Sequence, residues 1–317
     1  MNSSENFIKN LNKRNGQQYD KENGAVYDDQ PISIGKDTDG IEKTNHDLHA
    51  KILIIIKEID RICRKNNISY ALAFGSALGI NNYKGFIPWD DDADIAMDYQ
   101  DAYRFIEACK KDLSDDFYLN CYETDDKYNV LIPTMKIGLK NTYCQEITSF
   151  TLPNKCKNGD GIFVDIVIFM GVPENEKEHL KLLKYTKRKV IPYIFIDAFL
   201  RLNPKRLKNK IKDFEKRMYD KYQNSSHVAQ TIIIPWQDLL YSKHLSYPRE
   251  MIFPFREYEF EGEKFYSFNQ LEEYCKYQYG DQSVKKWEDG KWIDPYPSFK
   301  RKMKHLINFN LDHKIKK

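Results

Sequence analysis

Apolar residues recur at helical spacing in residues 45–65. The apolar face of this segment consists of Leu48, Ile52, Ile55, Ile56, Ile59 and Ile62. A stripe with this period is typical of an amphipathic helix that buries one side. Thr44 or Asn45 precedes the stripe, and both side chains can accept hydrogen bonds from the N–H groups of a first helical turn. The pattern predicts a helix over residues 45–65 that packs against a core.

Shorter apolar runs predict strands between further helices. The predicted strands are residues 69–74, 92–97, 117–123, 133–139 and 161–169, with a strand pair in 253–262. The predicted helices are residues 76–80, 101–111, 203–222 and 271–279. Residues 161–169 are apolar on both faces except at Asp165, which favours a central strand. The chain is therefore expected to be an α+β protein, with a mixed sheet core flanked by helices and a more helical C-terminal half.

The order of these segments suggests three regions. Residues 1–43 are polar and rich in Asn, Asp and Gly, which predicts a poorly ordered N-terminal arm. Residues 44–170 hold most of the predicted strands and are expected to form the catalytic core. Residues 171–317 would complete the binding sites for donor and acceptor.

Composition narrows the class of protein. The 317 residues carry a net charge of only +3, so nucleic acid is not an expected partner. Residues 181–217 hold 13 Lys and Arg against 3 Asp and Glu, which suggests a solvated helix face or peripheral contact with an anionic membrane. The six cysteines show no C-x-x-C pair, and no apolar run reaches the length of a membrane span. No signal peptide is expected from the polar first residues. We expect a cytoplasmic protein, with a place at the inner face of the membrane as a further option.

Acidic residues are concentrated in the segment Trp89-Asp-Asp-Asp-Ala-Asp-Ile-Ala-Met97. Side chains alternate across a strand, so Asp92 and Asp94 are expected on one face while Ala93 and Ile95 enter the core. Asp165 is a third candidate from a neighbouring strand, either as a Mg²⁺ ligand or in a buried ion pair. Asp90 and Asp91 are expected to shape the loop.

A Gly-Ser pair lies sixteen residues ahead of the pair Asp92 and Asp94. Gly75 permits a tight turn from strand to helix, and the N–H groups at the helix start, with the Ser76 hydroxyl, can hold a phosphate. Together with Asp92, Asp94 and Asp165, this turn resembles the site of the polymerase-β-like nucleotidyltransferase superfamily.

The full segment resembles a narrower family. Gly75-Ser-Ala-Leu-Gly79 and Lys84-Gly-Phe-Ile-Pro-Trp89, followed by the aspartates, are similar to the signature of the LicD family of phosphocholine transferases, which is related to the fukutins. Gly161-Ile-Phe-Val-Asp-Ile166 and Tyr279-Gly-Asp281 extend the resemblance over about residues 45–300. The chain departs from the family at Asn82, where a basic residue is usual.

The resemblance implies a nucleotidyltransferase-like fold and a defined reaction. Phosphocholine, or a similar phospho-alcohol, would pass from CDP-choline to a hydroxyl of a cell-surface glycan such as lipopolysaccharide, teichoic acid or capsule, and CMP would be released. Asp92, Asp94 and Asp165 would hold Mg²⁺, for which Mn²⁺ can substitute. The acceptor would be a glycan or a lipid-linked glycan.

Further residues are candidates for substrate binding. Lys84 and Arg256 would contact phosphate, or else form solvated or structural ion pairs. Asp281 would bind a ligand, next to a Gly280 that suits a helix C-terminus. Choline requires aromatic faces, and Trp89 is the best placed of them, although it also suits a packing role. The other aromatic candidates are Tyr83, Trp236, Trp287, Trp292 and Tyr296.

Two other functions fit the same residues. One is a nucleotidyltransferase that keeps the nucleoside monophosphate on the acceptor and releases pyrophosphate. The other is a non-catalytic relative that binds a glycan or a nucleotide, although the complete set of Asp92, Asp94 and Asp165 favours an enzyme.

Overall fold

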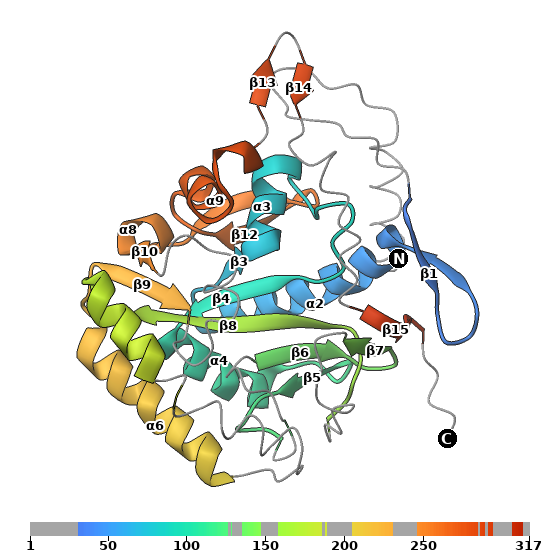
Figure 1. Cartoon of the computed structure of the whole chain (residues 1–317). Coiled ribbons are helices and arrows are strands. Elements are labelled where there is room, and N and C mark those ends of the chain that lie inside the picture. The colour runs from blue at the N-terminus through green and yellow to red at the C-terminus, as the bar shows by residue number, and fades with distance from the viewer. Residues whose placement is uncertain are drawn as a thin grey trace.

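A computed structural model of the chain shows a mixed β-sheet with helices packed around it (Figure 1). The residues that it describes are 31–125, 128, 135–146, 158–185, 188, 205–230, 246–284, 286–288, 291–293 and 306–312. Most of the predicted N-terminal arm lies outside them. The last part of that arm forms β1 (Ser33–Lys36), which pairs with β2 (Glu42–Thr44).

The largest sheet carries the strands that position the site. Its members are β3 (Ala71–Ala73), β4 (Asp94–Asp98), β5 (Phe117–Asn120), β6 (Met135–Leu139), β8 (Phe163–Gly171), β9 (His227–Gln230), β10 (Tyr247–Pro248), β11 (Arg256–Phe260) and β12 (Glu263–Ser267). The order is β10-β9-β8-β4-β3-β12-β11, with β6 also on β8 and β5 on β6. The pairs β4–β8 and β12–β3 are parallel and the others are antiparallel, so the sheet is mixed. The predicted α+β fold and the central place of β8 are confirmed.

Helix α2 (Asn45–Asn66) begins where the sequence predicts. Thr44 accepts a hydrogen bond from the Asp47 N–H while the Asp47 side chain accepts one from the Thr44 N–H, which is a complete capping box. The six predicted core positions of α2 are each at most 1% exposed. A fully buried Leu or Ile contributes about 1.5–3 kcal/mol, so this face anchors α2 on the sheet, where it packs against β6, β8 and α4.

Further helices lie around the sheet (Figure 1). They include α3 (Phe74–Tyr83), α4 (Tyr99–Asp112), α6 (Lys205–Tyr222), α8 (Arg249–Ile252), α9 (Leu271–Tyr279) and the 3₁₀ turn η1 (Asp281–Ser283). Helix α3 is longer than predicted, since it begins directly after β3. Gly280 terminates α9, as expected.

The C-terminal half is not the helical region that the sequence suggested. Its described residues include α6, α8 and α9, but also β9 to β12 and three further strands. Those strands are β13 (Lys286–Glu288), β14 (Lys291–Ile293) and β15 (Leu306–Asn310). Strand β13 pairs with β14, and β15 pairs with β7 (Tyr143–Glu146). The more helical character predicted for residues 171–317 is therefore not confirmed.

Two other predictions can be compared with the described residues. Five of the six cysteines are described, and all five are buried and free. Within the described parts of the chain, no helix is both long and apolar enough to cross a membrane. The basic segment 181–217 includes residues 186–187 and 189–204, which lie outside the described set.

Candidate active site

Asp94 and Asp165 occupy directly opposed positions on neighbouring strands. Strands β4 and β8 are parallel, and Asp94 is the register partner of Asp165. The Asp165 N–H donates to the Ala93 carbonyl at 3.1 Å, which fixes this register. Register partners point to the same face of a sheet, so the two side chains share a face. Both are half-buried, and their neighbours Ala93 and Val164 are buried.

Lys136 adds a third charged side chain beside Asp165, on the neighbouring strand β6. It is the register partner of Asp165 on β6, and its Nζ lies 3.1 Å from Asp165 Oδ1. The Lys136 side chain is 10% exposed and that of Asp165 is 23% exposed. The ion pair considered for Asp165 is therefore present, whereas its role as a metal ligand stays a prediction. We call Lys136, Asp165 and Asp94 the charged row.

The sequence interpretation missed Lys136, although a signal was present. Lys136 is a single charged residue within the apolar run from Met135 to Leu139, and all five positions of β6 are buried. A lone charge in one buried strand predicts an opposite charge in a neighbouring one, and Asp165 is the lone charge of β8.

The acidic loop before β4 gathers three more carboxylates. Oxygen atoms of Asp90, Asp91 and Asp92 all lie within 4.8 Å of one another. Carboxylate oxygens at this spacing suit Mg²⁺. Asp90 and Asp91 were expected to shape the loop, and the structure adds them to the candidate ligands beside Asp92. The predicted ligand set of Asp92, Asp94 and Asp165 remains a prediction.

Helix α2 donates two side-chain hydrogen bonds to the backbone of the acidic loop and of the residues just before it. Asn45 Nδ2 donates to the Pro88 carbonyl at 2.7 Å, and His49 Nε2 donates to the Asp90 carbonyl at 2.7 Å. The His49 ring also stacks on Phe86, with 4.3 Å between ring centroids. Asn45 and His49 are one helical turn apart, so both reach the same loop. The sequence interpretation did not single out either residue.

The C-terminal strand contacts the same loop. The Leu306 N–H at the start of β15 donates to Asp91 Oδ2 at 3.0 Å. A second contact joins β15 to the turn between β1 and β2, because the Thr38 N–H donates to the Phe309 carbonyl at 3.0 Å. The strand that contacts the acidic loop is thus itself held by the N-terminal hairpin.

The Gly-Ser turn lies against the carboxylates. A Cβ on Gly75 would come within 2.7 Å of Asp90 Oδ2, so the missing side chain leaves room for this carboxylate. The buried Ser76 Oγ accepts a hydrogen bond from the Asp94 N–H at 3.2 Å. The start of α3 is thereby connected to both the acidic loop and β4. Phosphate binding at Gly75 and Ser76 remains a prediction.

Lys84 and Trp89 each make a contact within the protein. Lys84 ends α3 with a φ of 51°, and its Nζ lies 3.6 Å from Glu259 Oε2, with both side chains exposed. Trp89 is partly buried and packs edge-on against Tyr83 at 6.2 Å. Both contacts are structural, and binding of phosphate or choline by these two residues is still a prediction.

Glu261 holds the loop between α3 and Trp89. The Phe86 N–H donates to Glu261 Oε1 at 2.9 Å, and the Glu261 N–H donates to the Lys84 carbonyl at 2.8 Å. Glu261 and Gly262 form the two-residue turn between β11 and β12, with φ values of 54° and 76°. Two positive φ angles in succession match the type I′ turn that suits a tight hairpin. The sequence interpretation missed this contact.

Arg256 lies away from the charged row. Arg256 is exposed at the start of β11, separated from β4 by β3 and β12, which corresponds to about 14 Å. Asp281 is exposed in η1, which is held to α3 because Asn82 Nδ2 donates to the Ser283 carbonyl at 2.9 Å. The Asn82 side chain, where the family has a basic residue, is thus buried and structural. Ligand binding by Arg256 and Asp281 remains a prediction.

The remaining aromatic candidates are only partly described. Trp287 and Trp292 are register partners in the β13–β14 hairpin. Trp236 and Tyr296 lie outside the described residues. A cage for choline therefore stays a prediction.

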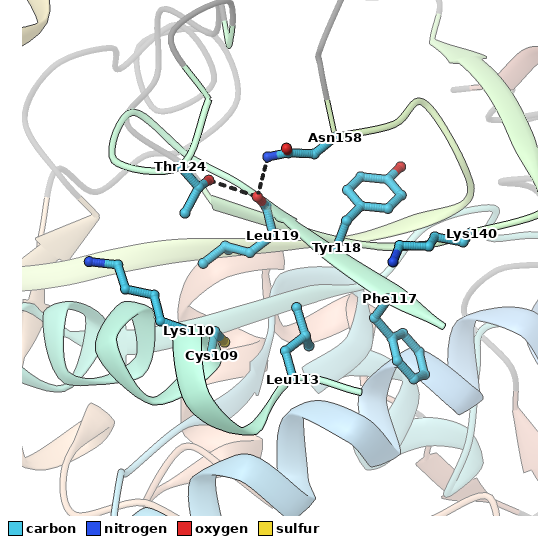
Figure 2. A pocket seen from close by; sticks show the side chains of 9 residues that line it. All are labelled: Cys109, Lys110, Leu113, Phe117, Tyr118, Leu119, Thr124, Lys140 and Asn158. Atoms are coloured by element: carbon cyan, nitrogen blue, oxygen red, sulfur yellow. Dashed lines mark hydrogen bonds between the residues drawn. The ribbon is translucent and has the colours of Figure 1, made fainter. Parts of the chain in front are cut away.

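A pocket of about 410 Å³ lies elsewhere, between the end of α4 and β5 (Figure 2). Its apolar wall includes Leu113 and Phe117. The Leu119 carbonyl accepts hydrogen bonds from Thr124 Oγ1 and from Asn158 Nδ2 in this pocket. None of the predicted site residues lines it, so it gives no support to a role in the reaction.

The structure thus brings aspartates together on adjacent central strands and places a Gly-Ser turn at the start of α3. A family model described as "LicD/FKTN/FKRP, nucleotidyltransferase domain" matches residues 67–203. This match confirms the predicted resemblance to the LicD family.

Two relatives show partial similarity. The lipopolysaccharide cholinephosphotransferase LicD of Haemophilus influenzae is 29% identical over 140 residues, which are 43% of this chain and 48% of that protein. The match thus spans about half the length of this relative. An uncharacterized protein of Rickettsia typhi is 37% identical over 51 residues, or 16% of each chain.

Proposed function

We propose that the protein transfers phosphocholine, or a similar phospho-alcohol, from CDP-choline to a glycan hydroxyl and releases CMP. The observation that carries the proposal is the placement of Asp94 and Asp165 side by side, next to the acidic loop, within the residues that match the LicD family model. The Haemophilus relative is named as a lipopolysaccharide cholinephosphotransferase, which supports this class of reaction.

The donor atoms at the site suit Mg²⁺. The oxygens of Asp90, Asp91 and Asp92 lie within 4.8 Å of one another, and all the candidate ligands are carboxylates, which Mg²⁺ prefers. Asp92, Asp94 and Asp165 would hold the ion, with Asp90 and Asp91 beside them. A bound Mg²⁺ supplies positive charge that stabilises the negative charge developing on transferred phosphate.

The chain's own groups would bind and orient the donor. The N–H groups at the start of α3, near Gly75 and Ser76, are suited to hold the donor phosphates. The acceptor oxygen then forms a bond to the phosphorus that carries choline, while the bond from that phosphorus to the oxygen of CMP breaks. Asp165 would either complete the metal site or accept the proton of the acceptor hydroxyl as a general base.

The products decide between this reaction and nucleotidyl transfer, which the description of the family model favours as the second candidate. Purified protein is incubated with Mg²⁺, lipopolysaccharide or teichoic acid, and either CDP-choline or CTP. We expect CMP from CDP-choline and phosphocholine on the glycan. Pyrophosphate from CTP with a nucleotide on the glycan would overturn the proposal in favour of nucleotidyl transfer, and binding without turnover would indicate a non-catalytic relative.

A further inference from the structure

The ammonium of Lys136 lies at one end of the charged row, on a largely buried side chain. Its Nζ is 3.1 Å from Asp165 Oδ1, 3.3 Å from Asp165 Oδ2 and 3.3 Å from the centroid of the Phe163 ring. Phe163 precedes Asp165 by two positions on β8, so it lies on the same face of the sheet. The ammonium therefore contacts a carboxylate and an aromatic face at once, and both contacts favour its charged form.

The positive charge of Lys136 offsets part of the repulsion between Asp94 and Asp165. Asp94 and Asp165 are register partners on strands that lie about 4.8 Å apart, so their negative charges repel. Lys136 adds one positive charge and lowers the formal charge of the row from −2 to −1. The counter-ion thus reduces the repulsion between the two carboxylates when no metal is bound.

The positive charge of Lys136 also opposes the binding of a divalent cation at Asp165. A cation at Asp165 must share that carboxylate with the ammonium and is repelled by it, and this repulsion is strong at short range in a partly buried site. The pyrophosphate of a donor brings its own negative charge and would offset the repulsion.

We infer that Lys136 is a built-in counter-ion that competes with a divalent cation for Asp165 and so makes metal binding depend on the donor pyrophosphate. This inference rests on the proposed function. Lys136 acts here as a positioning residue, because it holds Asp165 and reaches the metal only through it.

The test measures binding of Mn²⁺ alone, from the electron paramagnetic resonance signal of free Mn²⁺, with and without CDP-choline. The wild-type protein is expected to bind Mn²⁺ weakly alone and more tightly with CDP-choline. Lys136→Met should bind Mn²⁺ alone about tenfold or more tightly than wild type, since the competing charge is gone. Lys136→Arg should stay close to wild type because it keeps the charge.

Lys140→Met is the matched control. Lys140 follows β6, is exposed, and donates a hydrogen bond to the Asp115 carbonyl at 2.6 Å. The substitution Lys140→Met therefore removes the same charge outside the charged row. Its Mn²⁺ affinity should equal that of wild type. If Lys136→Met does not fold, Lys136→Gln removes the charge while keeping a polar group for Asp165, and the same gain is expected.

The outcomes separate the inference from the proposed function. If wild type binds Mn²⁺ in the presence of CDP-choline but neither uncharged variant gains affinity without it, the inference is overturned and the proposed function stands. If no protein binds Mn²⁺ under either condition, both are overturned.

Discussion

His49 Nε2 donates a hydrogen bond to the Asp90 carbonyl at 2.7 Å, across 41 positions of the chain. The bond joins the buried face of α2 to the acidic loop, and the stacking of His49 on Phe86 holds the preceding turn as well. The acidic loop is therefore held by a residue from the buried face of α2.

His49→Ala is expected to reduce the rate of CMP release markedly while the protein stays folded. The variant loses the donor to Asp90 and one stacking partner, which should cost about 1–3 kcal/mol of folding free energy and loosen the carboxylates. His49→Gln, which keeps an N–H donor, should recover part of the activity. Urea denaturation and CMP release measured side by side test this. Equal activity in Ala and Gln variants would contradict a role for the hydrogen bond.

Gly75→Ala is expected to destabilise the protein through Asp90. The new Cβ would lie 2.7 Å from Asp90 Oδ2, so the carboxylate or the turn must move. Because the clashing atom is the far end of a side chain, the cost should lie at the low end of the about 1–3 kcal/mol that is typical of overpacking. The test is a double-mutant cycle in urea denaturation with Asp90→Ala, which removes the atom that clashes. The cost of Gly75→Ala should fall in the Asp90→Ala background; an unchanged cost would show that another contact is responsible.

Glu58 is expected to contribute stability that disappears in acid. Burial alone would raise the pKa of Glu58, but hydrogen bonds from Arg61 and from the N–H and hydroxyl of Ser114 outweigh it and lower the pKa below its ordinary 4.5. A carboxyl whose pKa is lowered by folding stabilises the protein above the unfolded pKa, and this contribution is lost as pH falls through the folded pKa.

Glu58→Gln should therefore show a weaker loss of unfolding free energy than wild type as pH falls below 4.5. Near neutral pH the variant should be less stable by about 1–3 kcal/mol. Denaturation curves from pH 7 to pH 3 measure both effects. Glu107→Gln, at an exposed ion pair with Lys110, is the control and should leave the pH dependence unchanged. Parallel pH profiles for wild type and Glu58→Gln would refute the assignment.

Much of the fold could be predicted from local patterns. Helix α2 has its cap at Thr44 and its six apolar positions within one segment, and β8 is recognisable as central because Asp165 is its lone charge. Both signals depend on residues that are close in sequence.

The residues that were not predicted make their contacts with positions that are distant in the sequence. Lys136 meets Asp165 across 29 positions, His49 meets Asp90 across 41, and Phe86 meets Glu261 across 175. Strand order and loop paths decide these contacts, and neither is encoded in a local period. The candidate ligands were therefore predictable by type, whereas the residues that hold them in place were not.

The most direct measurement of the central claim is CMP release from CDP-choline with Mg²⁺ and a glycan acceptor, comparing wild type with Asp94→Asn. Asp116→Asn, at an exposed aspartate outside the site, controls for loss of a surface charge. We expect wild type and Asp116→Asn to release CMP at the same rate, and Asp94→Asn to lose at least about 100-fold, or about 2.7 kcal/mol of transition-state stabilisation, while remaining folded. Undiminished CMP release by a folded Asp94→Asn would contradict the assignment of the charged row as the active site.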